Sequence, residues 1–137
     1  MPSAGVTLDA AGNLYGTAAG GANDLGVVYK VDPSGQETVL HNFAGGADGE
    51  SPYSSLVLDA AGNLYGTTVA GGPAGAGVVF KIDASGNETV LHSFECAGDG
   101  CYPYSGLVLG PAGNLYGTTS GGGKYSGGVL FMLDPTG

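Results

Sequence analysis

Two acidic residues in equivalent loops are the side chains whose placement best suits metal or acid–base chemistry. Asp48 and Asp99 are each followed by Gly and, four residues on, by Pro52 or Pro103. If these loops surround a channel, their carboxylates form a ring of oxygen ligands able to hold Ca²⁺. The alternative, which we favour, is that each Asp hydrogen-bonds the backbone of its own turn.

Two histidines recur in the pattern Val-Leu-His-x-Phe and complete the set of catalytic candidates. Alternation along a strand places Val39, His41 and Phe43 on one face, and the copy containing His92 repeats this order. We expect packing residues with one hydrogen bond each, because a general base needs a nucleophile or water within reach and the sequence offers none nearby. Asp48, Asp99, His41 and His92 are therefore the catalytic candidates, without an assigned reaction.

Ligand-binding candidates lie in the Gly-rich loops, where aromatic, acidic and basic side chains stand among small residues. They are Tyr53, Tyr102, Tyr104, Tyr125, Glu50 and Lys124. Tyr presents a rigid amphipathic face to a sugar or another flat small molecule. Tyr53 and Tyr104 recur at equivalent positions, so packing between neighbouring units is the alternative that we favour for them. Lys124 would neutralise an anionic ligand or remain solvated.

The two cysteines lie in one loop, Glu-Cys-Ala-Gly-Asp-Gly-Cys, and the equivalent loop one repeat earlier has none. We favour a disulfide between Cys96 and Cys101 over free thiols. A disulfide suits an oxidising compartment. A metal site is less favoured, because two thiols without nearby His partners make an incomplete ligand set.

These candidates are positioned by a repeated unit. The phrase Asn-Leu-Tyr-Gly-Thr occurs at residues 13–17, 63–67 and 114–118. A period of about 40 to 50 residues that contains several short strands is typical of propeller blades or solenoids. One such unit cannot bury its apolar faces alone, so neighbouring units must stack.

Each unit is expected to form four strands. The first ends at Leu8, Leu58 and Leu109; the second is the repeated phrase; the third covers 27–31, 78–82 and 129–133; the fourth covers 37–43 and 88–94, without a third copy. Asp-Pro-Ser-Gly and Asp-Ala-Ala-Gly-Asn segments mark tight turns, so consecutive strands pair antiparallel. The sequence therefore predicts an all-β fold of β-propeller blades.

The predicted blades are residues 1–43, residues 44–94 with the loop that leads into the blade, and residues 95–137, which lack a fourth strand. About 2.7 blades cannot close a ring, since propellers have about four to eight. The outer faces would expose apolar surface, and the edge at 129–132 would be unpaired. We therefore expect homo-oligomerisation, with a six-bladed dimer favoured.

The segment 56–68, followed by Gly-rich residues and 78–83, resembles the GloVer tandem repeat, of the choice-of-anchor type, over nearly the whole chain. This resemblance implies a module of large secreted bacterial proteins. The first two strands are similar, more loosely, to NHL and SMP-30-like propellers. Some of those are calcium-dependent lactonases or phosphotriesterases, which implies Ca²⁺ as a cofactor, but none of their calcium ligands is matched here. By the same likeness the first strand lines the channel.

Composition limits the partners. Only three residues are basic and twelve are acidic, which gives a net charge of −9. Such a surface repels phosphate backbones and anionic membranes, so we expect neither nucleic acid nor membrane as a partner. No apolar stretch approaches the roughly 20 residues that span a bilayer. No signal peptide precedes the first repeat, and the Met1-Pro2-Ser3 start looks like a boundary.

The expected function is a secreted, self-associating propeller module, extracellular or on the cell surface, that binds a ligand such as a small molecule or glycan, or builds a surface structure. The alternative is a hydrolase of the lactonase, esterase or phosphotriesterase type. Its site, with or without a metal, would lie in the central channel of the assembled ring.

Overall fold

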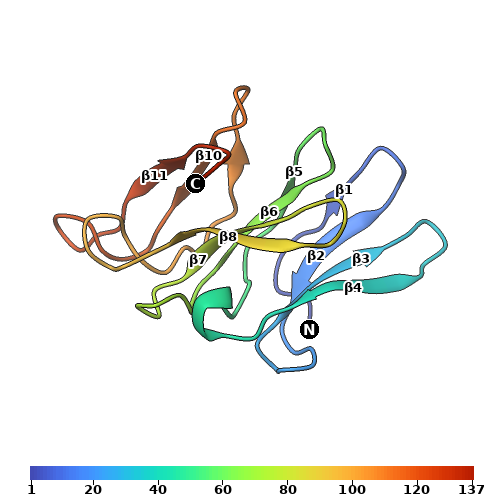
Figure 1. Ribbon diagram of the computed structural model, residues 1–137, viewed down its shortest axis with the longest axis horizontal. Coiled ribbons are helices and arrows are strands. Elements are labelled where there is room, and N and C mark those ends of the chain that lie inside the picture. The colour runs from blue at the N-terminus through green and yellow to red at the C-terminus, as the bar shows by residue number, and fades with distance from the viewer.

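A computed structural model describes residues 1–137 and contains three antiparallel sheets that stand side by side (Figure 1). The first sheet contains β1 (Thr7–Leu8), β2 (Leu14–Ala18), β3 (Val27–Val31) and β4 (Glu37–Asn42), in that order. The second contains β5 (Val57–Leu58), β6 (Leu64–Thr68), β7 (Val78–Ile82) and β8 (Glu88–Ser93). The third contains β9 (Val108–Leu109), β10 (Leu115–Thr118) and β11 (Leu130–Leu133). A single 3-10 turn, η1 (Gly46–Asp48), joins the first sheet to the second. The all-β fold of propeller blades predicted from the repeat is confirmed.

Side-chain alternation divides each sheet into two different faces. On β10, Leu115 and Gly117 are buried, whereas Tyr116 and Thr118 are exposed. The buried pair faces the second sheet, because Leu115 belongs to the core between the second and third sheets. Each sheet therefore has a face bearing the Tyr and Thr of the repeat and a face bearing its Leu and Gly.

The hydrophobic core consists of two equivalent layers, one at each boundary between sheets. At the first boundary, Val28 and Phe43 pack against residues of the second sheet: Leu56, Leu64, Phe80 and Ile82. At the second, the corresponding residues are Val79 and Phe94 packed against Leu107, Leu115, Phe131 and Leu133. The Phe pairs meet edge to face with ring centroids 5.1 Å apart at both boundaries, a geometry that aromatic rings favour.

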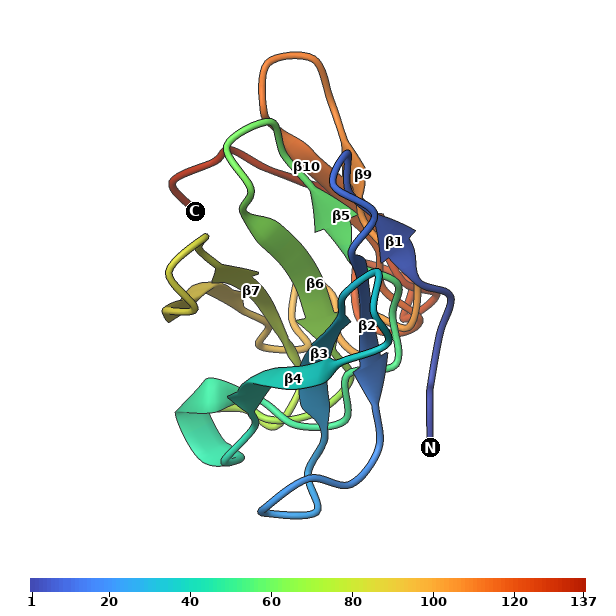
Figure 2. The same cartoon turned by 90° about the vertical axis from the view of Figure 1, so that its right-hand side faces the viewer.

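The first strands of the three sheets converge. Gly5 and Gly106, which lie just before β1 and β9, both lie against Ser55, just before β5. Figure 2 shows β1, β5 and β9 gathered along one side of the molecule. The strands at the other edge of each full sheet, β4 and β8, therefore lie away from the point of convergence.

Alternation along the fourth strand is interrupted by a bulge. Val28 pairs with His41 whereas Tyr29 pairs with Val39, so Leu40 has no partner across the ladder. Because neighbours on β3 point to opposite faces, His41 and Val39 do so as well. The prediction that these two residues share a face is therefore wrong. The second sheet has the same irregularity in its fourth strand.

Candidate functional site

The candidate site begins with a side-chain hydrogen bond between the fourth strand of the first sheet and the turn that follows it. His41 lies on β4, and its Nε2 donates to Oδ1 of Asp48 in η1 over 3.0 Å. The other carboxylate oxygen accepts the backbone N–H of Ala44 at 2.6 Å. The imidazole also packs against the ring of Phe43, with centroids 4.7 Å apart. Both side chains are about four-fifths buried, with relative exposures of 19% and 20%, so the pair is held in one geometry.

The second boundary repeats this pair. Nε2 of His92 donates to Oδ2 of Asp99 over 3.1 Å, and the same carboxylate accepts the backbone N–H of Glu95. This pair is more open to solvent, with side-chain exposures of 34% and 31%. The His and Asp are seven residues apart in each copy. This repeated spacing is a sequence signal for both pairs, although the two residue types were not paired from the sequence.

A second acidic residue joins the first pair. Glu88 begins β8 of the second sheet, and its carboxylate comes close enough to His41 and Asp48 to form a group of metal-ligand type. Burial, together with the charge of Asp48, raises the pKa of Glu88 from 4.5 to about 7. The Oε1 atom of Glu88 is buried and has no hydrogen-bond partner. No sequence signal marked Glu88, because its neighbours in the site come from the first sheet and from the turn that follows it.

Asp48 and Asp99 lie beside the fourth strands of the first and second sheets, and a carboxylate ring around a channel stays a prediction. Each bonds a backbone N–H of its own loop, as the turn interpretation expects, but each also reaches the His of a fourth strand. Those strands form the sheet edge opposite β1 and β5. The structure therefore places the two carboxylates at separate boundaries on the outer side, and it brings only Asp48 together with further ligand atoms.

The loop tyrosines lie at the surface, where their part in ligand binding stays a prediction. All four of them are exposed: Tyr53, Tyr102, Tyr104 and Tyr125. The ammonium of Lys124 lies 5.3 Å from the centroid of the Tyr125 ring, within range of a cation–π contact. Glu50 lies on a different loop and pairs through its backbone with Ala70.

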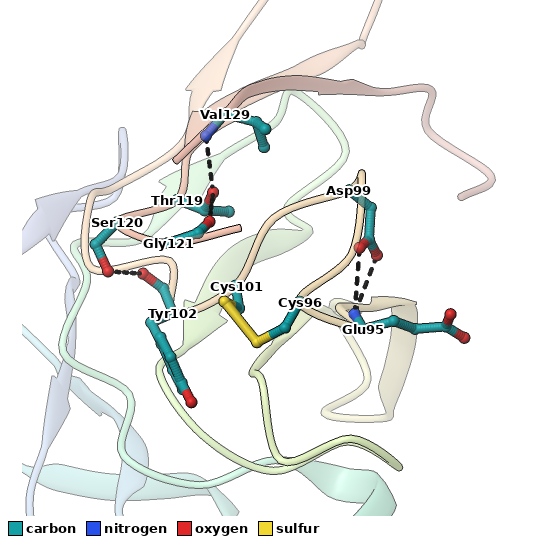
Figure 3. The surroundings of a disulfide bond; sticks show 9 residues. All are labelled: Glu95, Cys96, Asp99, Cys101, Tyr102, Thr119, Ser120, Gly121 and Val129. Carbon is teal, nitrogen blue, oxygen red and sulfur yellow. Dashed lines mark hydrogen bonds between the residues drawn. A yellow bond between two sulfur atoms is a disulfide. The ribbon is translucent and has the colours of Figure 1, made fainter. Parts of the chain in front are cut away.

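Cys96 and Cys101 are joined by a disulfide in the loop between the second and third sheets (Figure 3). The backbone of Cys101 pairs with that of Gly121, which follows β10, so this bridge ties the loop to the third unit. Asp99 lies in the same loop, and its carboxylate stabilises the loop by accepting the backbone N–H of Glu95 (Figure 3). The disulfide-closed loop therefore contains Asp99, the acidic member of the second His–Asp pair. The structure contains no helix long and apolar enough to cross a membrane.

Comparison with known proteins supports the same architecture. The sequence profile of the Gloeobacter/Verrucomicrobia repeat matches residues 1–137. An X-ray structure described as a candidate gluconolactonase superposes with a TM-score of 0.63 at 21% identity, over 85% of this chain and 41% of that chain. Virginiamycin B lyase from Staphylococcus aureus superposes with a TM-score of 0.58 at 15% identity, over 97% of this chain and 41% of the lyase.

A streptogramin B lyase structure also gives a TM-score of 0.58, at 19% identity, over 95% of this chain and 39% of the lyase. The chain thus spans about two fifths of the length of each of these structures. No curated protein matches the sequence. At these identities the likeness shows the propeller fold and not the chemistry.

Proposed function

The chain belongs to the Gloeobacter/Verrucomicrobia repeat family, and we propose from this premise that it is a secreted module that closes a propeller ring with copies of itself. We favour a ring of two chains. Each boundary between neighbouring sheets joins the Tyr and Thr face of one sheet to the Leu and Gly face of the next. The outer face of the third sheet is of the first kind and the outer face of the first sheet is of the second kind. We call these two the end faces, and their match to the internal boundaries is the observation that carries the proposal.

The internal boundaries are joined by the Thr of the repeat as well as by the apolar core. The hydroxyl of Thr17 donates to the backbone carbonyl of Ser54 in the next unit at 3.1 Å. The hydroxyl of Thr67 donates to the backbone carbonyl of Pro103 at 3.0 Å, and both threonines are fully buried. Thr118 occupies the corresponding place on the third sheet, where it is exposed. A further unit would meet this hydroxyl with a carbonyl.

Apolar residues accompany Thr118 on the end face of the third sheet. Leu130 is 76% exposed and Met132 is 60% exposed, while Phe131 between them packs against the second sheet. At the other end of the molecule, Val39 of the first sheet is 44% exposed. Contiguous apolar surface of this kind marks an interaction site in a soluble protein.

The two end faces are complementary because they belong to opposite sides of the same repeated boundary. The face of the third sheet that bears Tyr116 corresponds to the face of the second sheet that bears Tyr65, and the Tyr65 face packs against the third sheet within the chain. The Tyr116 face would pack in the same way against the face of the first sheet that bears Leu14 in a second copy. This contact is head to tail, and such contacts form a closed ring where the rotation allows it. Two copies provide six blades, within the range of about four to eight that closes.

Size-exclusion chromatography with light scattering tests the association. We expect a mass of twice the 13.3 kDa of one chain. Met132→Glu places a charge on the end face and should yield a folded species of 13.3 kDa, and Leu130→Glu should do the same. Tyr125→Glu is the matched control, because Tyr125 is exposed in a loop and its replacement should leave the mass unchanged. A monomeric parent protein at all concentrations contradicts the proposal.

The disulfide supports the secreted location, since such bonds persist in oxidising compartments. Under this proposal the loops of the closed ring bind a small molecule or glycan or contact a surface structure. Glycan-array binding by the assembled protein, with Tyr104→Ala as the variant, tests this part. Unchanged binding by the variant would remove Tyr104 from the ligand site.

Hydrolysis of an ester, lactone or phosphotriester in the ring channel is a second candidate function. The exposure of Tyr53 and Tyr104, which precede the first strands of the second and third sheets, favours it, because a ring that places those strands innermost would present both rings to a substrate in its channel. Turnover of a panel of these three substrate types by the assembled protein is the expected result. Absence of turnover across the panel would leave binding as the function.

A further inference from the structure

Three side chains from separate elements converge at the first boundary between sheets. His41 comes from β4, Asp48 from η1 and Glu88 from β8. One ligand atom from each lies within 4.8 Å of the other two. We propose that His41, Asp48 and Glu88 bind one divalent cation of the Zn²⁺ class.

The donor set identifies the class of metal. One imidazole nitrogen with two carboxylates suits Zn²⁺, whereas Ca²⁺ takes about six to eight oxygen ligands and no imidazole. Ligands of a tetrahedral Zn²⁺ at about 2.0–2.1 Å lie about 3.4 Å apart. The distances between the ligand atoms of His41, Asp48 and Glu88 therefore need to shorten by no more than about 1.4 Å, which rotation of the side chains can supply. The sequence offered Ca²⁺ only as a possible ion for a ring of Asp48 and Asp99, and the present proposal concerns a different donor set.

An independent observation comes from the unpartnered oxygen. Oε1 of Glu88 is the one buried side-chain polar atom of the chain without a hydrogen-bond partner. Buried carboxylates are normally paired or bound to a metal. The carboxylates of Asp48 and Asp99 are bonded by His41 and His92, and no basic side chain pairs with Glu88. A divalent ion would satisfy this oxygen and offset the repulsion between Glu88 and Asp48.

The second boundary supplies an internal control. His92 and Asp99 repeat the geometry of the first pair. The third sheet has three strands, so no residue stands in the position that Glu88 occupies on β8. The proposed site is therefore complete once in each chain, with three protein ligands and one open position for water.

The ion would join the first sheet, the connecting turn and the second sheet. Because the ligands come together only in the folded chain, binding must raise the melting temperature of the native state. All three ligands lie in one chain, so the site does not depend on association between copies.

Isothermal titration of EDTA-treated protein with ZnCl₂ tests the proposal, together with thermal melts in EDTA and in Zn²⁺. We expect one ion per chain and a melting temperature that rises with Zn²⁺ concentration. Glu88→Gln keeps the shape of the side chain and should weaken Zn²⁺ binding by at least tenfold. Asp99→Asn removes the partner of His92 and should leave both the affinity and the stoichiometry of the parent protein unchanged.

Three results would overturn the site. The first is absence of saturable Zn²⁺ binding at 1:1, and the second is unchanged affinity in Glu88→Gln. The third is loss of binding in Asp99→Asn, which would locate the ion at the second pair instead. CaCl₂ serves as the comparison titrant, and Ca²⁺ binding that is tighter than Zn²⁺ binding would contradict the assigned class.

Discussion

The ring of Phe80 on β7 lies over Gly66 on β6, its partner across the strand pair. A Cβ at Gly66 would stand 2.6 Å from Cζ of Phe80, closer than non-bonded carbons can approach. The first and third sheets have the same arrangement of an aromatic ring over a glycine. The glycine of the repeated phrase is therefore required because the aromatic ring of the third strand occupies the space of its side chain.

We expect Gly66→Ala to lower the free energy of unfolding by about 1–3 kcal/mol, the usual cost of adding a methyl group to a filled core. Phe80 is fully buried and has no room to move aside. Gly16→Ala is the matched control, since the nearest atom there is the hydroxyl oxygen of Tyr29 on an end face. Urea unfolding should show a smaller loss for Gly16→Ala, and equal losses would contradict this account.

The carboxyl of Glu88 should make the stability of the metal-free protein depend on pH. Its pKa is raised from 4.5 to about 7 by burial and by Asp48, while His41 is the other titratable group facing it. The native state therefore holds a proton that the unfolded state releases, and stability falls as pH rises from about 4.5 to about 7.

In EDTA at pH 8, Glu88→Gln should raise the free energy of unfolding by about 1–2 kcal/mol, after allowance for solvent screening of this partly buried group. At pH 4 the gain should vanish. Glu37→Gln, the exposed counterpart on β4, is the control and should have no such effect. Urea unfolding between pH 4 and pH 8 provides the measurement, and an unchanged pH slope in Glu88→Gln would rule out this role.

Asp59 organises the turn between β5 and β6 through four hydrogen bonds. Oδ1 accepts the N–H groups of Ala61 and Asn63, and Oδ2 accepts the side-chain amide of Asn63 and the hydroxyl of Tyr65, all at 2.9 Å. Burial raises the pKa of Asp59, but these bonds outweigh it and hold the pKa below 3.8. Burial and the bond to Asp59 also raise the pKa of Tyr65 to about 12.

A carboxyl whose pKa is lowered by folding stabilises the native state at any pH above its pKa in the unfolded chain. This contribution is lost as the pH falls through the folded pKa. Asp59→Ala should therefore cost about 1–2 kcal/mol at pH 7, the worth of hydrogen bonds to a charged group. The difference from the parent protein should shrink below pH 3.8. Acid unfolding followed by circular dichroism provides the test, and a difference that is constant with pH would contradict it. The third repeat has Gly110 in this position and keeps its turn, so the variant should still fold.

The disulfide should make a modest contribution to stability. Cys96→Gly with Cys101→Glu restores the residues of the equivalent loop, Gly45 and Glu50. Closing so short a loop is worth about 2 kcal/mol. Part of this is offset because Cys96 has φ of 62°, which favours glycine. We expect a net loss of about 1 kcal/mol. Reductant should lower the melting temperature of the parent protein and leave that of the variant unchanged.

Strand positions and turn positions could be predicted from the residues alone. The third strands at 27–31 and 78–82 were predicted with the bounds that the structure has. Alternation and turn formation act within a few residues, so a single repeat contains all the information that they need. The two predicted fourth strands extended one residue beyond the observed ends at Asn42 and Ser93, and the predicted third strand of the last unit began one residue before the observed start at Leu130.

The bulge at Leu40 and the ligand cluster could not be predicted in this way. The bulge reverses the face of Val39 through a pairing shift that leaves no mark in the apolar pattern. Glu88 reaches Asp48 although 40 residues separate them. Local propensity therefore determined where the strands lie. The packing of one sheet against the next decided which side chains meet, because contacts between sheets depend on twist, register and distance that no short segment contains.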